Sequence, residues 1–153
     1  MPHLSTYVGL ARHSEQTLAD SLRTVGQGHA QEPDVLFACQ ALATLSEAHL
    51  EELTPIAERY GEDDVEEPER LHATGLAEPR SGGIGLLRDL QDLHLLATLV
   101  QSTWTVVAQG AQGLRDQQLV ELADRAGAET ARQLAWLTTR MKVAAPQTLI
   151  VEK

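Results

Sequence analysis

Apolar side chains recur along this chain at alternating spacings of three and four residues, in four separate segments. Residues three and four apart share one face of a helix, so each segment predicts an amphipathic helix. The predicted helices span residues 5–25, 34–60, 84–112 and 116–144. The pattern therefore predicts an all-α fold built as a four-helix bundle.

The segment between the second and third predicted helices is much longer than the other two connections. Residues 61–83 show no sustained period and include the acidic run Glu62–Glu69. That run lacks the glycine-organised spacing of a calcium loop, so we interpret it as a solvated connection. At about 3.3 Å per residue, residues 61–83 can cross the whole bundle. The short joins predict two antiparallel hairpins, and the long segment predicts a crossover between them.

Glycine and proline suggest where the helices end and bend. Glycine at the end of a helix allows left-handed backbone angles, and proline removes one backbone hydrogen bond. Pro55 should kink the second helix without ending it, and the tail at 147–153 should be irregular. The expected stops of the four helices, in order, are Gly26–Gly28, Gly61, Gly110 with Gly113, and Pro146.

Composition narrows the class of protein. A chain of 153 residues with 42% hydrophobic and only 3% aromatic residues predicts one helical domain over residues 1–153. Twelve basic against 22 acidic residues give a net charge of −10, which disfavours nucleic acid and anionic membranes as partners. Cys39 is the single cysteine, and no signal peptide is visible, so we expect a cytoplasmic protein.

Two polar residues interrupt the apolar ladders. Glu15 falls between Ala11 and Leu18 on the first helix, and His49 falls between Ser46 and Leu53 on the second. If Glu15 faces the core it must be paired or bound, because an unpaired buried carboxylate costs several kcal/mol. If the first helix is rotated slightly about its axis, Glu15 instead lies at the edge of the buried face, with its carboxylate in water. His49 is either a hydrogen-bonded core histidine or a metal ligand.

These positions define a candidate metal site. Glu52 shares a side of the helix with His49, so Glu15, His49 and Glu52 could hold a single iron, manganese or zinc ion. His13 and His94 lie off the main apolar stripes, and Trp104 and Trp136 are expected as core or interface anchors. An apolar ligand pocket near Trp104 and His49 is a third interpretation.

Motifs of common enzymes do not occur in the sequence. There is no glycine-rich phosphate loop, no G-x-S-x-G elbow and no H-E-x-x-H pair. The sequence therefore leans away from an enzyme, without deciding the matter.

The helices and the long crossover resemble the ferritin-like superfamily. More narrowly, residues 111–116, 129–136 and 145–147 resemble a bacterial group of uncharacterised ferritin-like proteins. The resemblance implies a bundle that associates as a homo-oligomer, such as a dimer, or binds another protein.

Metal-binding ferritin-like proteins carry one Glu on each of two helices and a Glu-x-x-His on each of the other two. Glu15 matches a lone Glu, but Ser46 precedes His49 where a Glu is expected. On the last helix, Glu129 is followed three residues later by Arg132 in place of His. We therefore expect no di-iron centre and no cofactor, and a structural or interaction role. The alternative is a metal-binding or redox protein with a single ion at Glu15 and His49.

Overall fold

The computed structural model describes residues 2–61 and 74–152, and these ranges contain helices and no strands. Its four α-helices are α1 (Pro2–Gly28), α2 (Pro33–Tyr60), α3 (Gly82–Leu114) and α4 (Gln117–Pro146). A short π-helical segment, η1 (Gln147–Val151), follows α4. The predicted all-helical fold with four helices is confirmed. The acidic run Glu62–Glu69 lies outside the described residues.

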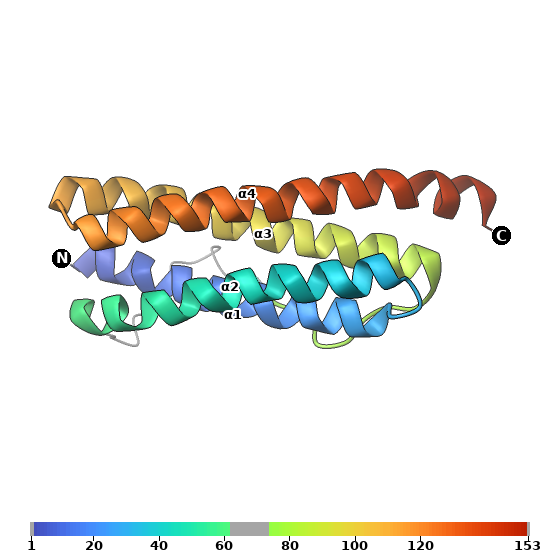
Figure 1. Ribbon diagram of the computed structural model, residues 1–153, viewed down its shortest axis with the longest axis horizontal. Coiled ribbons are helices and arrows are strands. Elements are labelled where there is room, and N and C mark those ends of the chain that lie inside the picture. Colours follow the sequence, from blue (N-terminus) through green and yellow to red (C-terminus); the bar gives the residue numbers. More distant parts are fainter. Residues whose placement is uncertain (1, 62–73, 153) are drawn as a thin grey trace.

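The four helices lie side by side along one long axis (Figure 1). α1 and α4 run from the end that holds the N-terminus toward the end that holds the C-terminus, and α2 and α3 run back (Figure 1). α1 packs against α2 and α3, while α4 packs against α3 and α2. Each helix is therefore flanked by two neighbours of opposite direction.

The core is formed by the helix faces that the apolar spacing predicts. Glu15 and His49 lie within these faces, with 0% and 2% of their surface exposed. Apolar side chains from all four helices join in one buried cluster, and removal of this surface from water is the main force holding the helices together. On α3 every predicted ladder position is buried: Leu86, Leu90, Leu93, Ala97, Val100, Trp104, Val107 and Ala111.

The middle of α4 departs from the predicted core. Leu134 and Met141 are only partly buried and pack against the edge of the apolar cluster. Thr130 and Gln133 are buried in their place. Their spacing from Ala126 continues the helical period, so the face is the expected one, but its middle carries polar side chains. These side chains lie at the level of His49, where α2 is also polar.

A series of polar pairs joins α2 to α4 along nearly their whole length. As the residue number rises along α2, that of its partner falls along α4, so the pairs set the register of the two helices. Polar contacts at defined levels disfavour a slip by one turn, because a slip would leave buried polar groups without partners. The pairs are Asp34–Arg140, Ser46–Gln133, His49–Glu129, Glu52–Arg125 and Tyr60–Asp116.

The helix ends fall at or close to the predicted stops. α2 ends at Tyr60 before Gly61, and α4 ends at Pro146, as predicted. α1 continues through Gly26 to Gly28, and α3 continues through Gly113 to Leu114. The left-handed cap of α3 is Arg115, with φ 61°, and not a glycine. Beyond Pro146 the predicted irregular tail is the π-helical segment η1, in which Glu152 N donates to Gln147 O at 2.9 Å. Favourable packing against α3 and the wider π turn let the chain continue past a proline that cannot donate.

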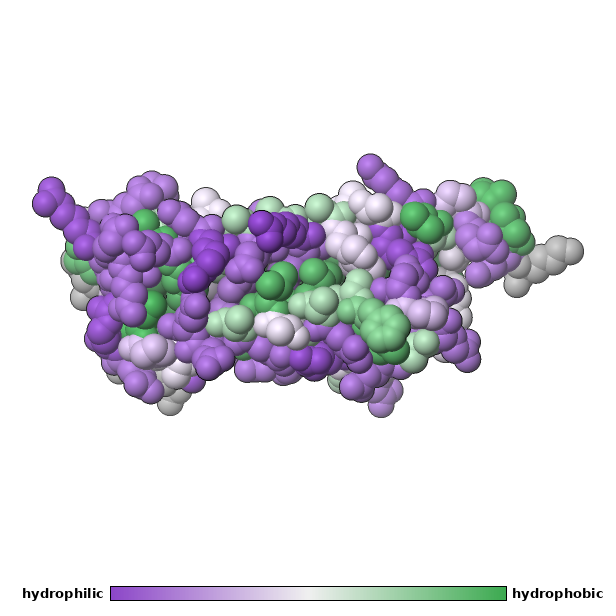
Figure 2. Space-filling model, viewed as in Figure 1, coloured by the Kyte–Doolittle hydropathy of each residue, from purple (hydrophilic) through white to green (hydrophobic). Residues whose placement is uncertain are grey.

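The surface is mixed in character. Within the described ranges, no helix is both long enough and apolar enough to span a membrane. Figure 2 shows polar side chains over most of one face, with apolar side chains along its middle and at the end of α4. That end continues past the turn that joins α1 to α2 (Figure 1).

Candidate functional site

A polar layer crosses the centre of the bundle, and each helix supplies one of its main side chains. Glu15 comes from α1, His49 from α2, Trp104 from α3 and Glu129 from α4. The first three are almost completely buried, whereas the Glu129 side chain is 21% exposed. The layer is therefore closed on three sides and reaches solvent beside α4.

His49 lies at the centre of this layer. Its Nδ1 is 2.5 Å from Glu15 Oε2, and its Nε2 is 3.1 Å from Glu129 Oε1. The two carboxylates thus lie on opposite edges of the imidazole ring. The ring also meets the Trp104 indole edge to face, with centroids 6.5 Å apart. These contacts hold the imidazole in one orientation.

The surroundings of His49 favour its charged form. Burial alone would lower the pKa of His49, but the hydrogen bonds and negative charges of Glu15 and Glu129 outweigh burial and raise the pKa above its ordinary value. Only the imidazolium can donate to two carboxylates, because neutral imidazole has one N–H. The geometry and the pKa shift agree on a cation held between two anions.

Glu15 is bound on one oxygen only. Trp104 Nε1 donates to Glu15 Oε2 at 3.0 Å, so this oxygen accepts from both Trp104 and His49. The other oxygen, Glu15 Oε1, is buried and accepts from none of the residues that the structure describes. A buried acceptor without a donor is costly, so this atom is a weak point of the layer.

Gln133 extends the polar layer along α4. Its Nε2 donates to Leu42 O and to Ser46 Oγ, each at 2.9 Å. Both N–H groups are thereby used, while Gln133 Oε1 is buried and accepts from no described residue. Thr130 donates to Ala126 O within α4 at 2.7 Å. Gln133 therefore links the polar part of the α4 ladder to α2, whereas Thr130 is satisfied within its own helix.

The residues present do not fit a di-metal centre. Such a centre needs several carboxylates that converge on two cations. Here Glu15 and Glu129 face opposite edges of His49, and α3 contributes an indole, which is not a metal ligand. In the described part of the chain, no group of three or more His, Cys, Asp or Glu side chains is arranged to hold a metal ion.

The structure brings together two of the three predicted metal ligands. Glu15 and His49 are in direct contact, but Glu52 is about half exposed and pairs with Arg125 of α4. His13 is exposed and His94 is half-buried on their own helices. Trp104 is in the core as expected, and its hydrogen bond to Glu15 was not predicted.

Glu129 is the member of the layer that the ladder pattern missed. It precedes the core position Thr130, and its side chain reaches inward from the edge of α4. The resemblance to ferritin-like ligand patterns had singled out Glu129, but its contact with His49 depends on the register of α4 against α2. Periodicity within one helix carries no information on that register.

A second buried ionic cluster lies near the turn between α1 and α2. His29 Nε2 is 2.8 Å from Asp89 Oδ2, and Arg80 donates to the same carboxylate from its backbone N at 2.9 Å and from Nη1 at 2.7 Å. Asp89 is fully buried and His29 nearly so. The sequence offered little signal for this cluster, because His29 lies in a predicted connection and Asp89 stands beside the α3 ladder.

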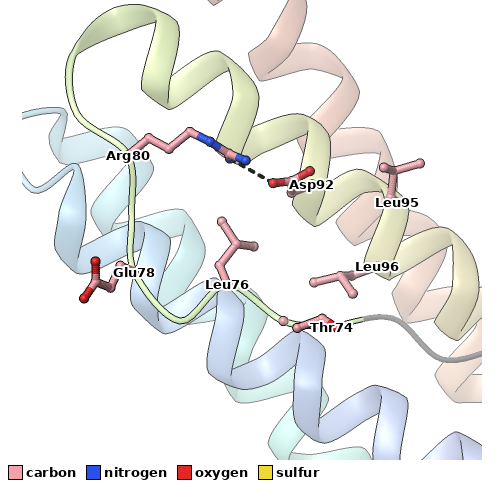
Figure 3. Close-up of a pocket in the computed structure, with 8 residues that line it drawn as sticks. Thr74, Leu76, Glu78, Arg80, Asp92, Leu95 and Leu96 are labelled. Carbon is pink, nitrogen blue, oxygen red and sulfur yellow. Dashed lines mark hydrogen bonds and ion pairs between the residues drawn. The ribbon is translucent and has the colours of Figure 1, made fainter.

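Arg80 also binds the outer face of α3. Figure 3 shows its side chain reaching from the loop to Asp92, at 2.8 Å, while Glu78 points away. Leu76 points from the same loop toward α3 (Figure 3). An open recess of about 350 Å³ lies here, with Leu95 and Leu96 among its lining residues. The cluster fastens the loop before α3 to the bundle, which is a structural role.

Comparison of the chain with protein-family models, with curated proteins and with solved structures found no significant match.

Proposed function

We propose that this protein is a ferritin-like bundle in which a structural charge network takes the place of a di-metal centre, and that it acts as a structural or interaction protein. The order of helix contacts supports the fold assignment. α1–α2 and α3–α4 are joined by short turns as antiparallel hairpins, α1 lies beside α3, and α2 lies beside α4. A long crossover between the second and third helices is the ferritin-like connection.

The observation that carries the proposal is the double engagement of His49. Both ring nitrogens face carboxylates, so neither is free to bind a metal while the network is intact. A cation between two anions that come from different helices ties α1, α2 and α4 together at one level. Such a network fixes how the helices pack against one another, and this role does not depend on any catalytic activity.

A second candidate function is a mononuclear iron, manganese or zinc site at Glu15 and His49. The buried Glu15 Oε1 favours it, since this oxygen accepts no hydrogen bond from the described residues and a carboxylate oxygen is a good ligand for such cations. Glu52 would take no part, because its carboxylate pairs with Arg125.

Elemental analysis separates the two functions. The purified protein is incubated with Fe²⁺, Mn²⁺ or Zn²⁺, desalted and analysed for metal per chain. We expect substoichiometric metal that is the same in the wild type and in His49→Ala. One ion per chain that disappears in His49→Ala and persists in the control Glu52→Gln would overturn the structural role in favour of the mononuclear site.

A further inference from the structure

Exposed apolar side chains are concentrated at one end of the bundle. Nine large apolar residues are exposed in the described ranges, and six of them belong to the beginning of α2, the beginning of α3 or the end of α4 with η1. These segments meet at the end of the molecule that holds the C-terminus (Figure 1). We call the six residues the apolar end: Phe37, Ile84, Val143, Leu149, Ile150 and Val151.

The apolar end is too large to be incidental. Exposure ranges from 46% for Ile84 to 80% for Ile150. Six side chains with such exposures together present on the order of 600 Å² of surface at one end of the bundle, an area comparable with that of the apolar patches that mark interaction sites on monomers. A stable protein interface buries about 800 Å² on each partner, so this patch with a polar rim is enough for one.

The shape of this end favours a second copy of the chain as the partner. α4 continues past the turn between α1 and α2, so the end of the bundle is stepped (Figure 1). A recess of about 500 Å³ lies at the step, and its lining includes His29 of the turn, Leu86 of α3 and Glu152 of the tail. A two-fold axis through the step would place the projecting tail of each copy over the recess of the other. The projecting tail and the recess are at the same end of the molecule, so both copies use the same surface. Such a two-fold pairing forms a closed dimer and does not extend into a chain of copies.

Charge at this end permits two like copies to approach. The segments 26–41, 78–92 and 138–152 carry six carboxylates and four basic groups: Glu32, Asp34, Glu78, Asp89, Asp92 and Glu152 against Arg80, Arg88, Arg140 and Lys142. Most of the net charge of −10 therefore resides on the rest of the chain. Two copies that meet at the apolar end keep their acidic surfaces apart, so repulsion is smallest in this orientation.

We infer that the apolar end is a homodimer interface, in which Leu149 and Ile150 of each copy pack against the step of the other. This inference deepens the proposed interaction function by naming its partner and its surface. It differs from association along helix faces, because the apolar side chains gather at the end of the bundle and not along one side.

The test is the oligomeric state of the whole chain, measured by sedimentation velocity and light scattering over a range of concentrations. We expect a concentration-dependent dimer, and we expect Ile150→Asp or Leu149→Asp to weaken it at least about 30-fold, as for a central interface residue. Both residues are mostly exposed, so the variants should fold, which helix content by circular dichroism verifies.

Leu95→Asp is the matched control, because Leu95 is 67% exposed on α3 away from the apolar end. This variant should dimerise like the wild type. A wild-type chain that stays monomeric, or a dimer that survives in both tail variants or is lost in Leu95→Asp, would overturn the inference. Metal content is measured separately, so failure of the structural role at His49 and failure of the interface give different results.

Discussion

At the scale of single residues, His49 decides how the centre of the bundle is held together. Its imidazolium is 2% exposed and is bound by carboxylates from α1 and α4. Removing one partner of a buried ion pair leaves the other charge uncompensated, which costs about 3–5 kcal/mol. The same geometry makes the stability of the protein depend on pH through His49.

The sign of this dependence follows from the raised pKa of His49. In the unfolded chain His49 titrates near its ordinary value of about 6.5, and in the folded protein it holds its proton to higher pH. The stabilisation is therefore fully present below about pH 6.5 and is lost as pH rises through the folded pKa. We expect the free energy of unfolding, measured in urea from about pH 5.5 upward, to fall across this window.

His49→Gln should remove this slope and lower the free energy of unfolding by about 3 kcal/mol at neutral pH, because Glu15 is left without a cation. His94→Gln is the control, since His94 is half-buried on α3 and lies outside the network. The free energy of unfolding of this variant should still fall with pH as in the wild type. If the slope persists unchanged in His49→Gln, then His49 is not the group whose charge stabilises the core.

At the scale of helices, α1 and α2 approach each other closely at Gly26. A Cβ added at Gly26 would lie 2.9 Å from Cys39 Cβ, closer than real Cβ contacts allow. Cys39 is fully buried, and burial raises the pKa of its thiol to about 12. The glycine that the sequence suggested as a helix stop is therefore a packing residue inside α1.

Gly26→Ala should lower the free energy of unfolding by about 1–3 kcal/mol, because α1 and α2 must move apart to admit the methyl group. Gly127 of α4 provides the matched control, since an added Cβ meets no atom within 4 Å. Gly127→Ala should raise stability by about 0.5–1 kcal/mol, the usual gain for replacing glycine inside a helix. Chemical denaturation measures both, and a Gly26→Ala variant as stable as the wild type would refute the close approach.

The same helices show what the sequence could and could not predict. Hydrophobic spacing identified the buried face of each helix and the inward position of His49, because periodicity reports which residues share a face. It left Glu15 open between the core and the flank, because a small rotation of the helix accommodates either position. It did not predict the contact of His49 with Glu129 or that of His29 with Asp89. Those contacts depend on the register between helices and on the path of loops, which separate local patterns do not contain.

At the scale of the whole molecule, charge and apolar surface are separated. The segments that form the apolar end carry a small acidic excess, and most of the net negative charge lies on the remainder of the chain. Between about 0.1 M and 1 M salt the Debye length falls from about 10 Å to about 3 Å, so repulsion between exposed charges is strongly screened over this range. Association at different surfaces should therefore respond differently to salt.

A dimer formed through the apolar end should change its dissociation constant by less than about threefold over this range of sodium chloride, because little net charge is brought together. A dimer formed through the acidic surfaces would instead tighten strongly as salt screens the repulsion between two chains of charge −10. Sedimentation equilibrium at several salt concentrations measures the dissociation constant directly.

Ile150→Asp supplies the internal comparison, because it adds one negative charge from each copy across the apolar end. The weak dimer that remains in this variant should therefore become salt-dependent, whereas the wild-type dimer should not. A steep salt dependence in the wild type would move the interface to the acidic surface of the bundle.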